Sequence, residues 1–341
     1  MADVLRIIDV GTVSALRSQS LWHGIPAAMV PGEDPVLSFC RPDTPYVGIG
    51  FHRSTSEIDR YALERRRWPL IRRRIGGGPV YLDENQLFFQ ISSPVVSAFE
   101  RLDKLYGKSL DPAVAALRSL GIDASRRGVN DLSVGGKKIS GTGAGCIGGG
   151  RVVVGNILFD FPHRRMAEIL AVPSPEFRRS VRDLMGRYVT SLRELGVSRL
   201  SEKVLKSTLV EHYAAALALS PQASDLSDRE REAIVEWEEK MRAPAWLEDR
   251  SAPARNFRQV KICADAWVTS SREDGVYFES SIVEQSVERF RAQSECGSAQ
   301  RLIEKIEGAP ADEASLSGRL ESFGSLGESA MRHFRRALVL R

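Results

Sequence analysis

The pattern of hydrophobic and polar positions in the first part of the chain predicts short strands separated by turns. Residues 36–40 and 46–50 are apolar runs on either side of Arg-Pro-Asp-Thr-Pro, so we expect two neighbouring strands there. The spacing Ser54-x-x-Glu57 matches a capping box and predicts the start of a helix that ends near Trp68. Residues 70–74 then enter a run of glycines from a further strand.

Strands and helices alternate through the middle of the chain. Residues 86–93 are rich in β-forming side chains, and residues 99–120 have helical spacing before Gly121, which favours a helix end. The run 151–160 is almost continuously apolar and is bounded by glycines, so it predicts a strand buried on both faces. From residue 166 to residue 241 the pattern is helical.

Within that helical stretch, residues 201–219 are amphipathic, and Ser227-x-x-Glu230 predicts the capped start of a last helix. Residues 243–254 are rich in proline and small residues, which is typical of a linker. After the linker, residues 259–268 and 275–284 predict a strand pair, and helices follow from about residue 298.

These elements predict an α+β fold with a mixed or mostly antiparallel sheet flanked by helices. With 341 residues and 43% hydrophobic content the chain can bury a large core, and its length favours two domains over one. We expect a main domain over residues 1–245 and a small α+β domain over residues 256–341.

Charge and hydropathy exclude two classes of partner. The 48 basic residues are nearly balanced by 44 acidic ones, and a net charge of +4 is too small to argue for nucleic-acid binding. No stretch approaches the ~20 apolar residues of a membrane span, and the N-terminus has no long apolar signal region. We therefore expect a soluble, cytoplasmic protein with no nucleic-acid or membrane partner.

Cysteine and histidine positions argue against a metal centre of the zinc type. The cysteines lie far apart, with no C-x-x-C pair, and indicate reduced thiols in a cytosolic protein. The five histidines show no H-x-x-x-H spacing. The four cysteines are Cys40, Cys146, Cys263 and Cys296.

Two glycine-rich basic segments, residues 72–80 and residues 130–141, carry the candidate chemistry. In the first, Arg72, Arg73 and Arg74 precede Gly76, Gly77 and Gly78. Glycines let backbone N–H groups approach a ligand closely, and arginines donate in pairs to phosphate or carboxylate oxygens. Together the two segments predict a pocket for a phosphorylated, negatively charged ligand.

Two other glycine patterns resemble nucleotide-binding motifs, but the residues around them do not fit such a site. Gly143-x-Gly145-x-x-Gly148 matches a dinucleotide fingerprint, but a valine-rich strand follows where a helix should start. Gly107-Lys108-Ser109 ends like a phosphate-binding loop, but Leu102 occupies the position of its first glycine and the setting is helical. Neither pattern is interpreted as a nucleotide site.

The order of the two basic segments resembles that of a known family. Arg-Arg-x-x-Gly-Gly-Gly-x-Val-Tyr-x-Asp, then Asn-Asp-Leu, then Gly-Lys-Lys-Ile-Ser-Gly is similar to lipoate-protein ligases, within the wider group of lipoate ligases, octanoyltransferases and biotin ligases. The resemblance covers about residues 1–250, and residues 256–341 resemble the accessory domain of these ligases. Biotin ligation is disfavoured because a Gly-Arg-Gly-Arg run is missing.

The resemblance implies a biotin/lipoate ligase-like catalytic domain and a reaction in two steps. Lipoate first attacks the α-phosphate of ATP, with Mg²⁺ as cofactor, to give lipoyl-adenylate and pyrophosphate. A lysine of an acceptor protein then takes the lipoyl group as an amide. The acceptors implied are a lipoyl domain of an E2 component, a glycine-cleavage H protein, or an H-like lipoate-binding protein.

By motif position, Lys138 is the implied catalytic residue, whose ammonium would bridge the acyl carbonyl and α-phosphate oxygens. Strand alternation places Lys137 on the opposite face. Arg73, with Arg72 beside it, is expected to face the adenylate or pyrophosphate, and Asp131 to bind Mg²⁺ or the adenylate. The other substrate- or adenylate-binding residues expected are Gly76, Gly77, Gly78, Val80, Tyr81, Asp83, Asn130, Ser140 and Gly141, and Phe51, Val80 and Tyr81 are candidate walls of an apolar acyl slot.

The chain departs from the family pattern in ways that leave alternatives open. Leu82 stands where the family commonly has a histidine, so no role of that histidine is transferred, and Pro79 removes one N–H donor from the loop. An ATP-independent octanoyl or lipoyl transferase with a thioester on Cys146 is one alternative, although Cys146 does not fall at the expected nucleophile position. A non-catalytic acyl- or carrier-binding protein is the other.

Overall fold

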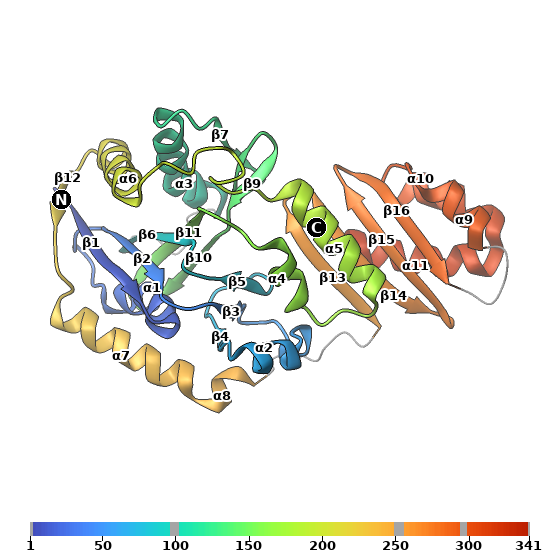
Figure 1. Ribbon diagram of the computed structural model, residues 1–341, viewed down its shortest axis with the longest axis horizontal. Helices are drawn as coiled ribbons and strands as arrows, with labels where there is room; N and C mark the ends of the chain where they lie inside the picture. The colour runs from blue at the N-terminus through green and yellow to red at the C-terminus, as the bar shows by residue number, and fades with distance from the viewer. Residues whose placement is uncertain (1–2, 96–101, 249–255, 294–298, 340–341) are drawn as a thin grey trace. The chain divides into compact units, whose positions relative to one another are not determined.

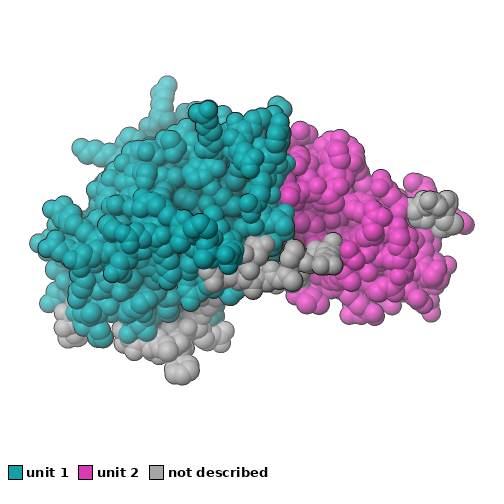
Figure 2. Space-filling view, turned by 90° about the horizontal axis from the view of Figure 1, so that it is seen from below, with its two compact units in different colours: residues 1–169, 190–251 teal, residues 170–189, 252–341 magenta. Residues whose placement is uncertain are grey.

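The computed structural model describes residues 3–95, 102–248, 256–293 and 299–339. The chain forms two compact units, shown in teal and magenta in Figure 2. The first comprises residues 1–169 and 190–251, and the second comprises residues 170–189 and 252–341. Residues 170–189, which were expected in the main domain, thus group with the C-terminal part of the chain. Within the described residues no helix is long and apolar enough to cross a membrane.

The first unit is built on a six-stranded sheet in the order β10-β11-β6-β2-β1-β12 (Figure 1). Strand β1 runs parallel to β2 and β12, whereas β6 and β11 pair antiparallel with their neighbours. The expected mixed sheet is therefore confirmed. The strands are β1 (Val4–Val13), β2 (Val36–Pro42), β6 (Gln86–Pro94), β10 (Thr142–Ile147), β11 (Gly150–Leu158) and β12 (Ser220–Ala223).

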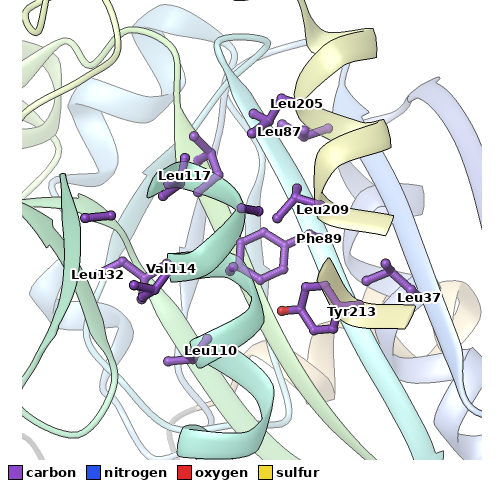
Figure 3. Packing of buried hydrophobic residues seen from close by; sticks show 14 of the residues in the cluster. Leu37, Leu87, Phe89, Leu110, Val114, Leu117, Leu132, Leu205, Leu209 and Tyr213 are labelled. Carbon is purple, nitrogen blue, oxygen red and sulfur yellow. The ribbon is translucent and has the colours of Figure 1, made fainter. Parts of the chain in front are cut away.

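Helices α3 (Leu102–Ser119) and α6 (Glu202–Leu217) pack on one face of this sheet. Figure 3 shows Phe89 of β6 between side chains of the two helices, such as Leu117 and Leu209. Because alternate residues of β6 point to this face, the strand supplies Leu87 and Phe89 to the same core.

The opposite face is covered by α1 (Ala15–Ala28) and α7 (Asp228–Arg242). These two helices pack so closely that a Cβ on Gly24 would lie 2.5 Å from the Ile234 side chain. Phe88 of β6 and Val152 of β11 join this second core, which is separate from the core shown in Figure 3.

Two three-stranded sheets carry the motifs. The first, in the order β4-β3-β5, consists of β3 (Tyr46–Ile49), β4 (Leu70–Arg72) and β5 (Val80–Leu82). The second, in the order β7-β8-β9, consists of β7 (Ala124–Arg127), β8 (Asp131–Val134) and β9 (Lys137–Ser140). The short elements near them are η1 (Thr55–Glu57), α2 (Arg60–Arg66), α4 (His163–Glu168) and α8 (Pro244–Leu247).

The second unit is an antiparallel sheet of β13, β14, β15 and β16 with helices around it. One face buries the aromatic side chains of Phe278, Phe290 and Phe334. Helix α5 packs on β13 and β14, and its Ser180 donates to the buried carboxylate of Glu279 on β15 at 3.0 Å. The elements are α5 (Pro175–Tyr188), β13 (Phe257–Cys263), β14 (Ala266–Glu273), β15 (Val276–Val283), β16 (Ser286–Gln293), α9 (Ala299–Ile306), α10 (Glu313–Leu320), η2 (Glu321–Phe323) and α11 (Gly324–Val339).

Several elements predicted from the sequence are confirmed. Residues 86–93 lie in β6, residues 151–158 of the second predicted run lie in β11, and β11 lies between two strands. The capping box at Ser227 is present, since its hydroxyl accepts from the Glu230 N–H and the Glu230 carboxylate accepts from the Ser227 N–H. Residues 107–109 lie in helix α3, and strand β11 follows Gly148. The helical and strand settings that excluded these two glycine patterns as nucleotide sites are therefore confirmed.

Other predictions were wrong in detail. Strands β2 and β3 belong to different sheets and are not paired. Ser54 caps only the short turn η1, and Asp59 caps α2 by accepting from the Ala62 N–H at 3.0 Å. Residues 259–268 contain a hairpin turn rather than one strand, so the expected strand pair is a four-stranded sheet. The helix predicted over residues 99–120 is α3, but residues 96–101, which include its expected start, lie outside the described residues.

Candidate active site

The glycine loop, residues 75–79, joins β4 to β5 and lies directly on top of Arg73. The Arg73 guanidinium donates to the carbonyl oxygen of Gly76 at 2.8 Å and to that of Gly78 at 2.9 Å. Gly77 has φ +96°, and a Cβ there would lie 2.6 Å from Nη2 of Arg73. From the other side, a Cβ on Gly50 would lie 2.1 Å from the Gly77 carbonyl oxygen. The loop therefore needs bare backbone at both Gly50 and Gly77.

The arginines before the loop have different environments. Arg72 is fully buried, and its guanidinium donates to the carbonyl oxygens of Gly50 at 3.0 Å and Leu247 at 3.0 Å. Burial lowers the pKa of Arg73 to about 10. Arg74 is exposed, with its guanidinium carbon 4.4 Å from the ring centre of Phe51. Arg72 and Arg73, which were expected to face the adenylate, are thus turned toward backbone carbonyls, and Arg74 reaches solvent.

A buried histidine holds the entry to the loop. Nε2 of His23 accepts the backbone N–H of Arg74 at 3.0 Å, and Nδ1 lies 2.7 Å from the carbonyl oxygen of Gln19. Because that oxygen can only accept, Nδ1 carries the proton. Burial lowers the pKa of His23 to about 3, so the ring is neutral near pH 7. The role of His23 was not predictable from the sequence, because only the packing of α1 brings this residue to the loop.

The lysine motif forms the hairpin of β8 and β9. Lys138 Nζ lies 2.7 Å from Oδ1 of Asp131, whose side chain is 3% exposed, whereas the lysine side chain is 23% exposed. The Lys138 carbonyl oxygen accepts from the Thr190 N–H at 2.8 Å. Ser140 is buried, and its hydroxyl has no hydrogen-bond partner among the residues that the structure describes.

The two motifs meet on one face of β10 and β11. Cβ atoms on Gly143 and Gly145 would lie 2.4 Å and 2.6 Å from the side chain of Ile75, so the glycine loop covers this face. Gly141 precedes them by an even number of residues and points the same way. A Cβ on Gly141 would lie 3.9 Å from Lys138 Nζ, which brings the ammonium to the face that Ile75 covers.

Cys146 lies on the other side of this strand. It is exposed, and it belongs to the regular ladder of β10 with β11, where it pairs with Arg151. Side chains alternate along a strand, so Cys146 points away from the face that carries Gly143 and Gly145. Cys40 and Cys263 are buried, and Cys296 lies outside the described residues.

The residues after the glycine loop divide between two environments. Val80 packs with Ile75 in the core beneath α1, and Leu82, which stands in place of the family histidine, belongs to the same core. Tyr81 is buried on the opposite face of β5, where its hydroxyl accepts from Arg165 at 3.3 Å. Of these candidate slot residues, Val80 therefore lies on the side of Ile75 and Tyr81 does not.

The side chains of Asp83 and Asn130 form hydrogen bonds with nearby backbone groups. Asp83 is buried, its Oδ1 accepts from the Asn85 N–H at 3.0 Å, and burial raises the pKa of its carboxyl group. Asn130 donates to the carbonyl oxygen of Thr142 at 3.2 Å, which ties the start of the lysine hairpin to β10.

Among the residues that the structure describes, the acidic side chains form no group that could hold a metal ion by itself. Asp131 has its Oδ1 engaged by the Lys138 ammonium. Over residues 3–95, 102–248, 256–293 and 299–339, no three His, Cys, Asp or Glu side chains come together as a metal site. In phosphate chemistry Mg²⁺ is often held by one or two carboxylates together with the substrate phosphates. The acidic residues of this site therefore fit Mg²⁺ only if the nucleotide phosphates supply further ligands.

Sequence comparison places this site in a known family. The model of the lipoyl protein ligase A/B catalytic domain matches residues 26–214, more than half of the chain, and the chain belongs to this family. It is 26% identical over 266 residues to the octanoyltransferase LipM of Kyrpidia tusciae, which covers 71% of this chain and 97% of that protein. It is 26% identical over 197 residues to a probable lipoate-protein ligase A of Mycoplasma pneumoniae, covering 56% of this chain and 57% of that one.

Solved structures agree on the fold. A bipartite lipoate protein ligase from Thermoplasma acidophilum superposes with a TM-score of 0.66 at 22% identity, covering 75% of this chain and 99% of that chain. A lipoate-protein ligase A bound with ATP superposes with a TM-score of 0.62 at 21% identity, covering 73% and 99%. The family and the ligase-like fold predicted from the motif pair are thus confirmed. The chain spans nearly all of the octanoyltransferase but little more than half of the Mycoplasma ligase.

Proposed function

We propose that the protein is an ATP-dependent lipoate-protein ligase. The lipoate carboxylate attacks the α-phosphorus of ATP, the bond to the β-phosphate breaks, and pyrophosphate leaves. The amine of an acceptor lysine then attacks the acyl carbonyl of lipoyl-adenylate, loses a proton and displaces AMP. The observation that carries the proposal is the Lys138–Asp131 pair at 2.7 Å, on the sheet face that the glycine loop covers.

Lys138 supplies the charge that both steps need. Negative charge develops on the α-phosphate oxygens in the first step and on the acyl oxygen in the second, and a fixed ammonium beside them stabilises both transition states. Asp131 is nearly buried, and its contact with Nζ restricts the rotamers of the lysine. The ammonium is therefore held in place before a substrate binds.

The glycine loop supplies access and a positive field. Gly76, Gly77 and Gly78 are exposed, so phosphate oxygens can approach their backbone. Arg73 lies beneath the loop with a pKa of about 10 and remains charged near pH 7, although its hydrogen bonds go to the loop carbonyls. Arg74 is the loop arginine that reaches solvent, which makes it our candidate for direct contact with pyrophosphate.

When Mg²⁺ binds together with the nucleotide, it would neutralise part of the phosphate charge. Asp131 is the carboxylate that we propose as its protein ligand. For the acceptor we propose a lipoyl domain of an E2 component, a glycine-cleavage H protein or an H-like lipoate-binding protein. The Thermoplasma ligase was solved as part of a lipoylation system with its E2 lipoyl domain, which supports an acceptor of this class.

The test is lipoate-dependent release of pyrophosphate from ATP, followed by mass spectrometry of a lipoyl domain. The wild type should release pyrophosphate and add one lipoyl group to the acceptor. Lys138→Ala should lose both activities, and Lys137→Ala is the matched control because strand alternation turns it away from Lys138. Equal turnover by Lys138→Ala and the wild type would contradict the proposal.

A second candidate function is ATP-independent octanoyl transfer through a cysteine thioester. The similarity to the octanoyltransferase of Kyrpidia tusciae over 97% of its length favours it. The position of Cys146, on the face of β10 opposite Gly143 and Gly145, argues against it. Transfer from an octanoyl carrier without ATP, abolished in Cys146→Ser, would establish this alternative. Full activity of Cys146→Ser would exclude Cys146 as its nucleophile.

A further inference from the structure

Two amide side chains connect the strand after the glycine loop to the end of the lysine motif. Gln86 Nε2 donates to the carbonyl oxygen of Tyr81 at 3.1 Å. Gln86 Oε1 accepts from Nδ2 of Asn156 at 2.6 Å. Asn156 Oδ1 in turn accepts the backbone N–H of Gly141 at 2.8 Å. We call this series of hydrogen bonds, Tyr81–Gln86–Asn156–Gly141, the amide relay.

The direction of the amide relay is fixed by the backbone at its two ends. The Gly141 N–H can only donate, so Asn156 must present its oxygen there and its NH₂ group to Gln86. The Tyr81 carbonyl can only accept, so Gln86 must present its NH₂ group there and its oxygen to Asn156. Both amides are thus held in one orientation, and neither can turn over without breaking contacts at both of its ends.

The amide relay ends beside the ammonium of Lys138. From the Cβ position of Gly141, Asn156 Oδ1 lies 3.5 Å away and Lys138 Nζ lies 3.9 Å away. Gln86 is fully buried, and Asn156 is half-buried on β11, opposite Gly141 in the continued ladder of β10 and β11. Both amides lie outside the two basic segments, residues 72–80 and 130–141, yet together they connect these segments.

We propose that Gln86 and Asn156 are positioning residues, which set the distance between the glycine loop and Lys138 without touching a substrate. The proposal rests on the ligase function above, because an adenylate must contact the phosphate-binding loop and the ammonium together. A rigid amide link fixes that separation before binding, so little reorganisation is left for the reaction step. Such support for catalytic groups is often decisive for rate.

The first experiment is amide hydrogen exchange at Gly141, measured by NMR on the full chain. Asn156→Ala removes the acceptor directly, whereas Gln86→Ala removes only the support of that acceptor and does not touch Gly141. We expect both variants to accelerate exchange at Gly141 by about tenfold or more. Unchanged exchange in Gln86→Ala would overturn the amide relay.

The matched control is Gln90→Ala. Gln90 is a buried glutamine of the same strand and the same face, but it accepts from Ser38 at 2.6 Å and has no bond to Asn156. Its loss should leave exchange at Gly141 near the wild-type rate. Acceleration equal to that of Gln86→Ala would show general loosening of β6 and would overturn the specific link.

Isosteric variants separate orientation from packing. In Asn156→Asp, oxygen replaces the NH₂ group that faces Gln86. In Gln86→Glu, oxygen faces the Tyr81 carbonyl. Either change keeps the shape and places acceptor against acceptor. Both should accelerate exchange at Gly141, and Asn156→Asp with wild-type exchange and rate would contradict the fixed direction.

The second experiment uses the reaction itself. Asn156→Ala should lower kcat for pyrophosphate release by about tenfold with little change in the KM for ATP, because a positioning residue makes no contact with nucleotide. The residual rate of adenylate formation in Lys138→Ala, measured in single turnover at high enzyme concentration, should not fall further when Asn156→Ala is added. Additive losses would show that Asn156 does not act through Lys138.

The two proposals fail in different ways. A wild type that forms no adenylate refutes the ligase function, while the exchange measurements still decide whether the amide relay exists. Normal wild-type activity with unchanged exchange in Gln86→Ala refutes the amide relay alone.

Discussion

The Nε2 atom of His23 accepts the backbone N–H of Arg74 at 3.0 Å, and this bond joins α1 to the entry of the glycine loop. The second unit contains a counterpart in His333, whose two ring nitrogens lie 2.9 Å from the hydroxyls of Ser271 and Ser280. Both histidines are fully buried, and burial lowers the pKa of each to about 3.

These histidines predict loss of stability in acid. Below the unfolded-state pKa of 6.5, the unfolded chain binds protons that the folded chain does not, so stability falls as pH falls from 6.5 toward 3. Each histidine should cost ~1.4 kcal/mol of unfolding free energy per pH unit in that window. Urea unfolding at pH 7, 6 and 5 measures the slope.

The control for this prediction is His23→Gln, which keeps an acceptor near Arg74 but cannot titrate. This variant should reduce the pH dependence of the free energy of unfolding of the first unit by the contribution of one proton. An identical slope in the wild type and in His23→Gln would contradict a buried neutral His23.

Gly50→Ala should disrupt the glycine loop. Its Cβ would lie 2.1 Å from the Gly77 carbonyl oxygen, so the backbone of the loop would have to move. We expect a loss of stability of about 1–3 kcal/mol and a lower rate of adenylate formation. Thermal unfolding and pyrophosphate release measure the two effects.

Gly76→Ala is the matched control for stability. At Gly76, apart from its own chain neighbours, no heavy atom of the described residues lies within 4 Å of the Cβ position, so this variant should unfold like the wild type. A loss of activity in Gly76→Ala without a loss of stability would locate ligand contact at this backbone. Equal instability of the Gly50 and Gly76 variants would contradict the close packing at Gly50.

The Lys138–Asp131 pair should show coupling in a double-mutant cycle. Lys138→Met leaves a nearly buried carboxylate without its ammonium and should cost about 3 kcal/mol of stability. Adding Asp131→Leu should recover most of that stability but none of the activity. Chemical denaturation of the two single variants and the double variant checks this, and additive destabilisation would contradict a direct pair.

Gly145 and Ile75 should compensate one another. A Cβ on Gly145 would lie 2.6 Å from Cγ2 of Ile75, so Gly145→Ala should displace Ile75 and slow adenylate formation. Adding Ile75→Ala should restore part of the rate by making room. If the double variant is slower than Gly145→Ala alone, steric conflict is not the cause.

Local features of the site were predictable from the sequence. Lys138 and Asp131 lie on adjacent strands of one hairpin, so their approach depends on neighbouring residues only. The run of three glycines likewise predicted an exposed stretch of backbone, because this too depends on neighbouring residues only. Long-range features were not predictable: Arg72 is held by the Leu247 carbonyl, far along the chain, and the motif gives no sign of this acceptor.

The fold shows the same division between local and distant information. Strand β11 and the capping box at Ser227 follow from short patterns, and both are confirmed. The grouping of residues 170–189 with the C-terminal sheet was missed, because amphipathic spacing predicts helix α5 but not the strands it covers. Strand β1 was not predicted at all, since Gly11 and charged residues interrupt its apolar pattern.

The contact of Arg72 with Leu247 predicts that a folding fragment of the first unit must extend at least to residue 247. The Trp246 indole donates to the Arg72 carbonyl oxygen at 2.8 Å, so residues 244–247 hold this arginine from both its backbone and its side chain. A fragment cut at residue 214, where the family match ends, would lose these partners and the α7 cover of α1. Truncation experiments should therefore find a folding boundary beyond Leu247, more than thirty residues past residue 214, where the family match ends.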